Sequence, residues 1–287
     1  MKKIQYLFQS LIIFLLFAIF KILGLKISSY ISEKIFQIFG PMFRSNKICH
    51  RNLTIALPEF DKTQRENLIK QMWKNYGKIF AEYIFIKKFR ENESYSRKIK
   101  LENPNELEII KNDGKPVIFI SGHFNNFEFM AMEIERYGIN LAAIYRPLNN
   151  LFLNPIMEKI RKKYICAKQI KKGKSGTKEI LKEFKNGTSI ALMIDQRVSE
   201  GVSSDFFGQK AFTTTIPAQF VKKFNAKVIP IYIERLKSDE FKLKISGPVN
   251  LDKEENIETI TLKLNKILEK MILKNPDQWI WTHNRWK

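Results

Sequence analysis

The feature that most constrains the fold of this chain is a buried-strand pattern that ends in a glycine turn. Residues 116–121 read PVIFIS, a run of β-branched and aromatic side chains with no polar face before Ser121. A continuous apolar run of this length predicts a strand buried on both faces of a sheet. Gly122 permits a sharp turn, and residues 125–137 then follow an apolar helical pattern. A strand that is covered on both faces and leads into a helix predicts an α/β protein.

The chain after residue 100 repeats this alternation of short strands and helices. The strand patterns cover residues 116–121, 139–145, 164–168, 188–194, 227–234 and 241–246. The helical patterns cover residues 104–112, 125–137, 151–163, 176–186, 216–225 and 256–274. This order predicts a mostly parallel sheet flanked by helices.

Before residue 100 the chain shows only helical patterns, over residues 27–43 and 61–89, with a polar connection at 92–95. No Gly/Ser-rich linker, low-complexity tract or internal repeat divides the sequence. We therefore expect residues 26–287 to form a single domain that is helical to about residue 100 and α/β after it.

The first 25 residues predict an N-terminal membrane-anchoring helix. Two lysines precede the apolar run 6–20, and residues 22–25 continue the run beyond Lys21. The strictly apolar part is shorter than the roughly 20 residues that span a bilayer, and no small-residue cleavage site follows it. A spanning helix with Lys21 snorkelling and a helix lying in the interface both remain open, and a buried core helix is the alternative. A shallow or re-entrant anchor keeps the body cytoplasmic, and we expect residues 1–25 to be dispensable for the chemistry.

His123 lies between the strand at 116–121 and the helix that follows, a position where open α/β sheets often carry catalytic groups. Glu128 follows five residues later, within reach of the imidazole across the first turn. A carboxylate bonded to one ring nitrogen fixes the tautomer and makes the other nitrogen a better proton acceptor. His123 and Glu128 are therefore candidate catalytic residues that activate a hydroxyl. The alternative interpretations are a capping box formed by Asn125 and Glu128 and a His123 that only bonds backbone in the turn.

The charge of the chain favours acidic partners. Lys and Arg number 50 against 29 Asp and Glu, which gives a net charge of +21. Nucleic acid, anionic lipid and acidic protein all suit such a charge. Cys49 and Cys166 are too few for a disulfide framework, and no Cys/His cluster has zinc-ligand spacing. No metal is implied, and the absence of a glycine-rich phosphate or dinucleotide motif leaves nucleotide binding without support.

Three further charged residues end strand or helix patterns: Arg146, Arg161 and Asp195. A guanidinium matches phosphate or carboxylate bidentately, so the two arginines are candidates for binding substrate or a developing oxyanion. The stretch 159–178 has nine basic residues and no acidic one, and its lysines predict a solvated face. Asp195 ends a strand pattern, where a carboxylate does not suit core packing.

Two aromatic segments lie nearer the C-terminus. Residues 206–215 (FFGQKAFTTT) predict an apolar, hydroxyl-rich loop that leads into a helix. The tail 279–287 holds three of the four tryptophans and suits either a membrane-interface belt or ordinary packing. His283 is a competing base, but no carboxylate stands near it in the sequence. We interpret His283 and Arg285 as residues that line or support the site.

Taken in order, these segments resemble the bacterial lipid A biosynthesis acyltransferases, the lauroyl and myristoyl transferases of the wider lysophospholipid acyltransferase-like superfamily. The resemblance extends from the apolar N-terminus to the last residues. It rests on the ordered motifs Gly122-His123 with Glu128, Tyr145-Arg146-Pro147, Arg161, Asp195-Gln196, Phe206-Phe207-Gly208 with Thr213-Thr214-Thr215, and Trp281-Thr282-His283-Asn284-Arg285.

The resemblance implies transfer of a fatty acyl chain from an acyl carrier protein thioester to a hydroxyl of a 3-hydroxyacyl chain on a phosphorylated, acylated glucosamine disaccharide. It implies that His123 is the general base, that Glu128 orients it, and that Arg161 and Asp195 matter to activity. It implies no metal or organic cofactor. The expected partners are acyl carrier protein, an anionic lipid A precursor and the cytoplasmic face of the bacterial inner membrane, which a basic body would attract.

Three rival functions differ from this one in features of the sequence. A glycerolipid acyltransferase, such as a lysophosphatidic acid acyltransferase, usually carries a Phe-Pro-Glu-Gly-Thr-like motif where this chain reads IDQRV at 194–198. A basic nucleic-acid-binding protein fits the charge but lacks a recognised module and does not explain the apolar N-terminus. A non-catalytic membrane scaffold would not need His123 and Glu128 together.

Overall fold

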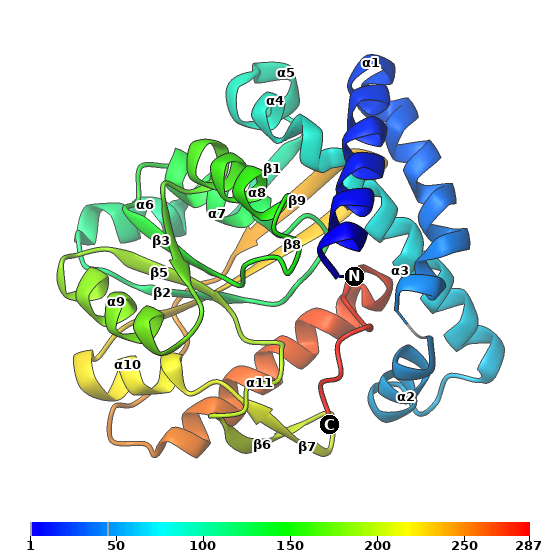
Figure 1. Ribbon diagram of the computed structural model, residues 1–287. Coiled ribbons are helices and arrows are strands. Elements are labelled where there is room, and N and C mark those ends of the chain that lie inside the picture. Colours follow the sequence, from blue (N-terminus) through cyan, green and yellow to red (C-terminus); the bar gives the residue numbers. More distant parts are fainter. Residues whose placement is uncertain (1, 45) are drawn as a thin grey trace.

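The computed structural model describes residues 2–44 and 46–287 and has a seven-stranded sheet between layers of helices (Figure 1). The strand order is β1-β9-β8-β2-β5-β3-β4, and all paired neighbours are parallel except β8 and β9. The strands are β1 (Ile99–Glu102), β2 (Ile118–Ser121), β3 (Leu141–Tyr145), β4 (Lys168–Lys171), β5 (Ser189–Met193), β8 (Val228–Lys237) and β9 (Glu240–Ile245). The predicted α/β fold with a mostly parallel sheet is confirmed.

Helices cover both faces of this sheet, as the apolar sequence of β2 requires. All four residues of β2 are buried, and β2 is the central strand. One face carries α7 (Glu128–Arg136) and α8 (Asn154–Ile160). The other carries α9 (Lys174–Lys185), α10 (Ile216–Phe224) and α11 (Ile257–Lys274), while α6 (Asn105–Asp113) joins β1 to β2 (Figure 1).

The expected loop at 206–215 is wrong, because most of it belongs to a hairpin. The strands β6 (Val202–Phe206) and β7 (Gln209–Thr213) pair in antiparallel register and pack against α11. Burial alternates along β7, where Ala211 and Thr213 point inward. The turn uses left-handed backbone at Phe207 and Gly208. The alternation is short and built on small and hydroxyl side chains, so the sequence suggested an irregular segment.

Other differences from the predicted elements have local causes. The strand expected at 164–168 is wrong, because a π-helical turn (Arg161–Ile165) extends α8 and β4 begins only at Lys168. The polar connection at 92–95 contains the short helix α5 (Glu93–Ser96), capped by the Asn92 side chain. Helix α7 begins at Glu128 rather than at residue 125, because Asn125 has a left-handed φ of 42°. The helix α2 (Asn46–Ala56) and the strand β1 were not predicted.

The apolar N-terminus folds back on itself as a helical hairpin. Helix α1 (Lys2–Phe43) is broken at Gly24, whose φ of 77° and ψ of 167° suit glycine alone. The residues on either side run as two antiparallel arms, 2–23 and 25–43 (Figure 1). The Ser28 hydroxyl donates to the Phe20 carbonyl across the reversal, and Phe80 of α3 contacts Phe17 on one arm and Phe36 on the other.

Over the described residues, α1 is the one helix long and apolar enough to cross a membrane, and it is a candidate membrane anchor. Met1, the first residue of the anchor predicted at 1–25, lies outside the described residues. The second arm packs along α3 (Lys62–Glu82), which begins with a capping box between Asp61 and Gln64. The chain then continues through a 3-10 turn (Tyr83–Phe85) and α4 (Ile86–Glu91) to α5.

The C-terminal tail packs inside the protein. Trp279 and Trp281 are almost completely buried, and the Asn52 side chain on α2 donates to the carbonyl oxygens of Trp281 and His283. A 3-10 turn (Pro276–Gln278) links α11 to this tail. Of the two interpretations of the tryptophan-rich tail, ordinary packing is therefore correct for these two residues.

Candidate active site

The candidate site lies at the carboxyl ends of four neighbouring parallel strands. His123 follows β2, Asp195 follows β5, Arg146 follows β3 and Lys172 follows β4. Ser121 pairs with Met193 in the sheet register, so His123 and Asp195 stand two residues beyond one matched pair. Side chains far apart in sequence thus meet at one edge of the sheet, the usual site position in open α/β folds.

The Asp195 carboxylate holds the His123 residue by both its ring and its backbone. His123 Nδ1 lies 2.8 Å from Asp195 Oδ1, and the His123 backbone N–H donates to Oδ2 at 2.7 Å. The Trp279 indole N–H also donates to Oδ2, at 2.8 Å. These donors and the nearby imidazole outweigh the burial that opposes ionisation, and they hold the pKa of Asp195 at about 2. A carboxylate on Nδ1 leaves Nε2 as the proton-accepting nitrogen of the neutral ring.

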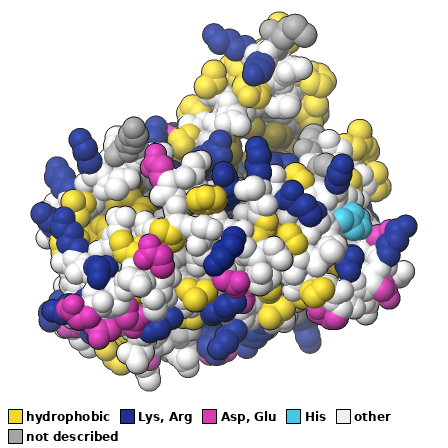
Figure 2. Space-filling view, turned by 90° about the horizontal axis from the view of Figure 1, so that it is seen from below, with side chains coloured by type: hydrophobic (Ala, Val, Ile, Leu, Met, Phe, Trp, Pro, Cys, Tyr) yellow, Lys and Arg dark blue, Asp and Glu magenta, His cyan; other side chains and the backbone are white. Residues whose placement is uncertain are grey.

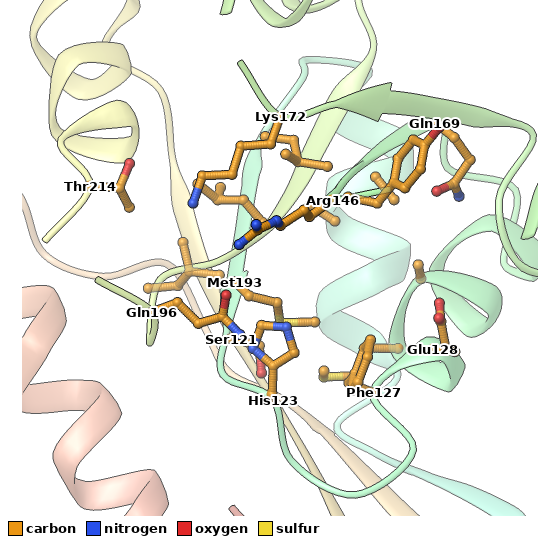
Figure 3. A pocket seen from close by; sticks show the side chains of 18 of the residues that line it. Ser121, His123, Phe127, Glu128, Arg146, Gln169, Lys172, Met193, Gln196 and Thr214 are labelled. Atoms are coloured by element: carbon orange, nitrogen blue, oxygen red, sulfur yellow. The ribbon is translucent and has the colours of Figure 1, made fainter. Parts of the chain in front are cut away.

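The expected contact between Glu128 and the imidazole is not the one that the structure forms. Glu128 Oε1 accepts from Arg161 Nε at 2.8 Å and from Nη2 at 2.5 Å. Phe127 packs edge-on against the His123 ring, and Glu128 lies beyond that phenylalanine in the close-up (Figure 3). The capping-box alternative is also wrong, since Glu128 is the first residue of α7 and Phe127 makes no side-chain cap. The carboxylate that orients His123 is therefore that of Asp195.

Glycine at 122 is explained by close packing rather than by an unusual φ. A Cβ there would stand 3.0 Å from atoms of Leu268 and Phe124 and 3.3 Å from Asp195 Oδ2. The turn after His123 is held by residues outside the sheet. The Asn125 backbone N–H donates to the Gln278 carbonyl at 3.0 Å. The Asn126 amide donates to the buried Glu82 carboxylate at 3.1 Å. These contacts fix the backbone on both sides of His123.

Arg146 and Lys172 supply positive charge at the opening of the site. Both extend over the space above His123, with Gln196 between them and the imidazole (Figure 3). Neither forms an ion pair with any residue of the described part of the chain. Burial and the Arg146 charge lower the pKa of Lys172 from its ordinary value. Two unneutralised cations this close favour an anionic ligand. Lys172 was missed because it lies in a run of lysines that suggested a solvated face.

Unlike Arg146 and Lys172, Arg161 forms an ion pair within the protein. Its side chain is 11% exposed and its guanidinium forms an ion pair with Glu128. The Arg161 Cζ atom also lies over the Tyr145 ring, 5.6 Å from its centroid. Both Arg161 bonds go to Glu128 Oε1, and no described residue hydrogen-bonds Oε2. The pair forms part of the wall of the cavity, with Oε2 as its unused acceptor.

A cavity of about 440 Å³ opens beside His123, a size typical of small-molecule sites. Phe119, Ala191, Ala143 and Gln169 form one row of its lining, since they are register partners across four strands. The two alanines are small and only half-buried, so they leave a trough between the sheet and α7, which contributes Met130 and Ile134. The cavity has a charged opening and a largely apolar interior.

His283 borders this cavity, whereas Arg285 lies behind it. His283 Nε2 accepts the Arg197 backbone N–H at 3.0 Å. Arg285 is fully buried and donates to the Phe212 carbonyl and to Thr213 Oγ1, which ties the tail to β7. Burial lowers the pKa of Arg285 to about 10, although Asp195 opposes that shift. Among the described residues, no group of three or more His, Cys, Asp or Glu suits a metal ion.

The His283 environment predicts a loss of stability in mild acid. Burial lowers the pKa of His283 from 6.5 to about 4, with Asp195 opposing and Arg285 assisting. Between these values the unfolded chain binds a proton that the folded chain excludes, so the free energy of unfolding falls as pH drops from 6.5 towards 4. We expect His283→Gln, which keeps an acceptor but does not titrate, to flatten this part of the melting-temperature profile.

Thermal melts of both proteins in detergent across that pH range test this expectation. Titration of Asp195 does not contribute to the profile in this pH range, because its pKa lies below the range in both states, at 3.8 when unperturbed and about 2 when folded. Parallel profiles for wild type and His283→Gln would contradict the assignment of the acid sensitivity to His283.

The parallel sheet, the imidazole–carboxylate pair and the adjoining apolar cavity are the architecture of an α/β enzyme. The model of the family described as bacterial lipid A biosynthesis acyltransferase matches residues 1–287, and the chain therefore belongs to this family of acyltransferases. Its membership supports acyl transfer in lipid A biosynthesis.

Individual relatives are distant but cover most of the chain. The lipid A biosynthesis lauroyltransferase of Escherichia coli (strain K12) is 23% identical over 257 residues, 86% of this chain and 80% of the relative. The lipid A biosynthesis acyltransferase of Haemophilus influenzae is 23% identical over 249 residues, 85% and 78% of the two chains. The lipid A biosynthesis myristoyltransferase of Escherichia coli is 21% identical over 235 residues, 80% and 71%. The expected resemblance to this family is confirmed.

Proposed function

We propose that this acyltransferase moves a fatty acyl chain from an acyl carrier protein thioester to the hydroxyl of a 3-hydroxyacyl chain on a phosphorylated, acylated glucosamine disaccharide. The observation that carries the proposal is the His123 imidazole, which is held by Asp195 at a charged opening and borders an apolar cavity. A base, an anion site and a hydrocarbon slot are the three parts that such a reaction needs.

His123 acts as the general base. An aliphatic hydroxyl has a pKa far above neutral, so its proton must leave as the new bond forms. His123 Nε2 takes this proton, and the hydroxyl oxygen attacks the thioester carbonyl carbon. The ionised Asp195 stabilises the imidazolium that results. When the intermediate collapses, the carbon–sulfur bond breaks and the imidazolium returns the proton to the thiolate, which leaves an ester and a free thiol.

The remaining groups bind the two substrates. Arg146 and Lys172 meet phosphate groups or the oxyanion, because both are cations of the cavity lining that form no ion pair with a described residue. The apolar trough over Ala143 and Ala191 accepts an acyl chain. Glu128, held by Arg161, offers Oε2 to a substrate group. His283 supports the opening by fixing the backbone at Arg197, and Arg285 supports it from behind.

The proposal extends to location. The body lies at the cytoplasmic face of the bacterial inner membrane, where acyl carrier protein supplies the donor. The net charge of +21 suits both an acidic carrier protein and an anionic lipid surface, and the exposed apolar α1 supplies an anchor.

A direct comparison of acceptors tests the proposed function. The purified enzyme is given one acyl carrier protein thioester together with the phosphorylated disaccharide lipid and lysophosphatidic acid, and products are separated by mass. We expect acylation of the disaccharide lipid to dominate. Preferential acylation of lysophosphatidic acid would overturn the acceptor assignment in favour of a glycerolipid acyltransferase while leaving His123 as the base.

Arg146→Gln reports on the phosphate part of the same proposal. Loss of the guanidinium is expected to raise the KM for the disaccharide lipid about tenfold or more, since a charged hydrogen bond of roughly 1.5 to 3 kcal/mol is lost. An effect confined to kcat would instead assign Arg146 to the oxyanion.

A further inference from the structure

The segment after Arg146 exposes an unusual number of apolar side chains. Leu148, Leu151, Phe152 and Ile156 are all exposed within nine residues, and Leu151 reaches 60%. Leu148 also lines the opening of the cavity. We call residues 148–156 the rim segment. An exposed apolar group of this kind beside a binding site marks an interaction surface rather than ordinary surface composition.

The rim segment is fastened to the first arm of α1 by buried polar contacts. Asn150 Nδ2 donates to the Tyr6 carbonyl at 2.9 Å. The Ser10 hydroxyl has two acceptors within reach, the Tyr6 carbonyl at 2.7 Å and Asn150 Oδ1 at 3.0 Å. Ser10 is 1% exposed and Asn150 is 8% exposed. Asn150 Oδ1 also accepts the backbone N–H of Phe152 at 3.0 Å, so one amide holds both the rim segment and the arm.

The first arm also presents an apolar stripe to the outside of the molecule. Its outward residues recur at helical spacing from end to end and are Ile4, Leu7, Phe8, Leu11, Ile12, Leu15, Ile19 and Ile22. In the space-filling view, a projection at the place of α1 stands clear of the body, and its visible side chains are largely hydrophobic or basic (Figure 2). The first acidic residue of the chain is Glu33, on the second arm.

Basic side chains flank the rim segment. Lys159 and Lys163 follow Ile156 at helical spacing and are exposed, as is Lys162. Apolar side chains bordered by lysines match the two layers of an anionic bilayer surface, because the apolar groups enter the acyl boundary and the lysines meet the headgroups. This charge and the continuity with the candidate anchor α1 identify the occupant of the surface as lipid.

We propose that the rim segment is a second membrane-binding element, which inserts into an anionic bilayer together with the first arm of α1. The contacts of Asn150 with Tyr6 and Ser10 lock the two elements together, so the opening of the cavity faces the lipid. An acceptor lipid then reaches His123 from the bilayer without crossing water. The anchor thereby helps to position the site. Its removal would detach the protein from the membrane and would also leave the rim segment without its contacts to the first arm.

Site-specific fluorescence tests the insertion. The native Cys49 and Cys166 are fully buried, so a cysteine introduced as Leu151→Cys in the full chain takes an environment-sensitive dye selectively. Ile109→Cys on α6 is the matched control, because Ile109 is 57% exposed and α6 lies far from α1 (Figure 1). Leu15→Cys reports the anchor. The probe surface is a vesicle of phosphatidylethanolamine and phosphatidylglycerol, with and without lipids brominated in their acyl chains.

We expect blue-shifted emission and quenching by brominated lipid at positions 151 and 15, and neither change at position 109. A dye at 151 that stays water-exposed while the dye at 15 inserts would overturn the proposal. A blue shift at 151 that depends on protein concentration and not on vesicles would assign the surface to a second copy of the chain and overturn it equally.

Two variants test the lock. Asn150→Ala removes both contacts to the arm, and Ser10→Ala removes only the hydroxyl while keeping the Asn150 bonds to its own segment. In each, we expect quenching at 151 to fall, more strongly for Asn150→Ala, while quenching at 15 is unchanged. Unchanged quenching at 151 in both variants would contradict the proposal that these contacts hold the rim segment at the bilayer. Retained quenching at 15 confirms in the same samples that the protein is folded and anchored.

Discussion

Replacing His123 by alanine is expected to lower the rate of acyl transfer by about 10²- to 10⁴-fold, the usual contribution of a general base. Asp195→Asn is expected to approach the same loss. It preserves the shape of the side chain but removes the negative charge that fixes the His123 tautomer and stabilises the imidazolium. The double variant should be little slower than His123→Ala alone, because groups that act as a unit are not additive.

Single-turnover measurements with labelled acyl carrier protein give the rates, and circular dichroism checks the fold. His50→Ala is the matched control, since His50 lies on α2 and has no place in the proposed chemistry. Trp279→Phe should cost less, about tenfold, because it removes one of three hydrogen bonds to Asp195 while keeping the charge. Near-normal turnover by His123→Ala would contradict the proposed mechanism.

The sequence predicted His123 as the base and assigned its carboxylate partner by proximity along the chain. Glu128 is five residues from His123, whereas Asp195 is 72 residues away and reaches it only through the parallel register of β2 and β5. The relevant signal was present, since both residues follow buried strands by two positions. Choosing between the two carboxylates required the strand order, which depends on which strands pack as neighbours. Local periodicity does not contain that information.

The elements that were predicted best are those whose local pattern agrees with their tertiary environment. The run at 116–121 is apolar on both faces because both faces are covered, and its strand was found. Helix α7 was extended too far because a single left-handed residue, Asn125, overrides the apolar period. That conformation is stabilised by the Gln278 carbonyl, which lies 153 residues away in sequence. Contacts of this kind have no counterpart in a window of neighbouring residues.

The structure of the N-terminal segment also depends on contacts with residues that are distant in the sequence. Gly24 lies one residue before the end of the predicted anchor, and its φ of 77° turns the segment into a hairpin whose start contacts Asn150. The apolar composition predicted the anchor, but the hydrogen bonds that Ser10 and Tyr6 form with Asn150 depend on a segment 140 or more residues away. The expectation that residues 1–25 are dispensable for the chemistry stays a prediction, which deletion of these residues would test.

The second large effect is expected at the Glu128–Arg161 pair. Both side chains are about one-tenth exposed, at 9% and 11%. Removing either partner leaves the other as an uncompensated buried charge, which typically costs about 3 to 5 kcal/mol. We therefore expect Glu128→Ala and Arg161→Ala each to lower the free energy of unfolding by about that amount, measured by denaturant unfolding in detergent. Both should also lose most turnover.

A paired replacement separates stability from chemistry at these two positions. Glu128→Met combined with Arg161→Met fills similar volume without charge, and buried ion pairs replaced in this way often keep their stability. We expect the double variant to regain nearly all of the lost unfolding free energy. Turnover should remain at least about 10²-fold low, because the substrate loses the Glu128 Oε2 acceptor. If turnover recovered together with stability, the pair would only hold the cavity wall, and His123 with Asp195 would carry the reaction without it.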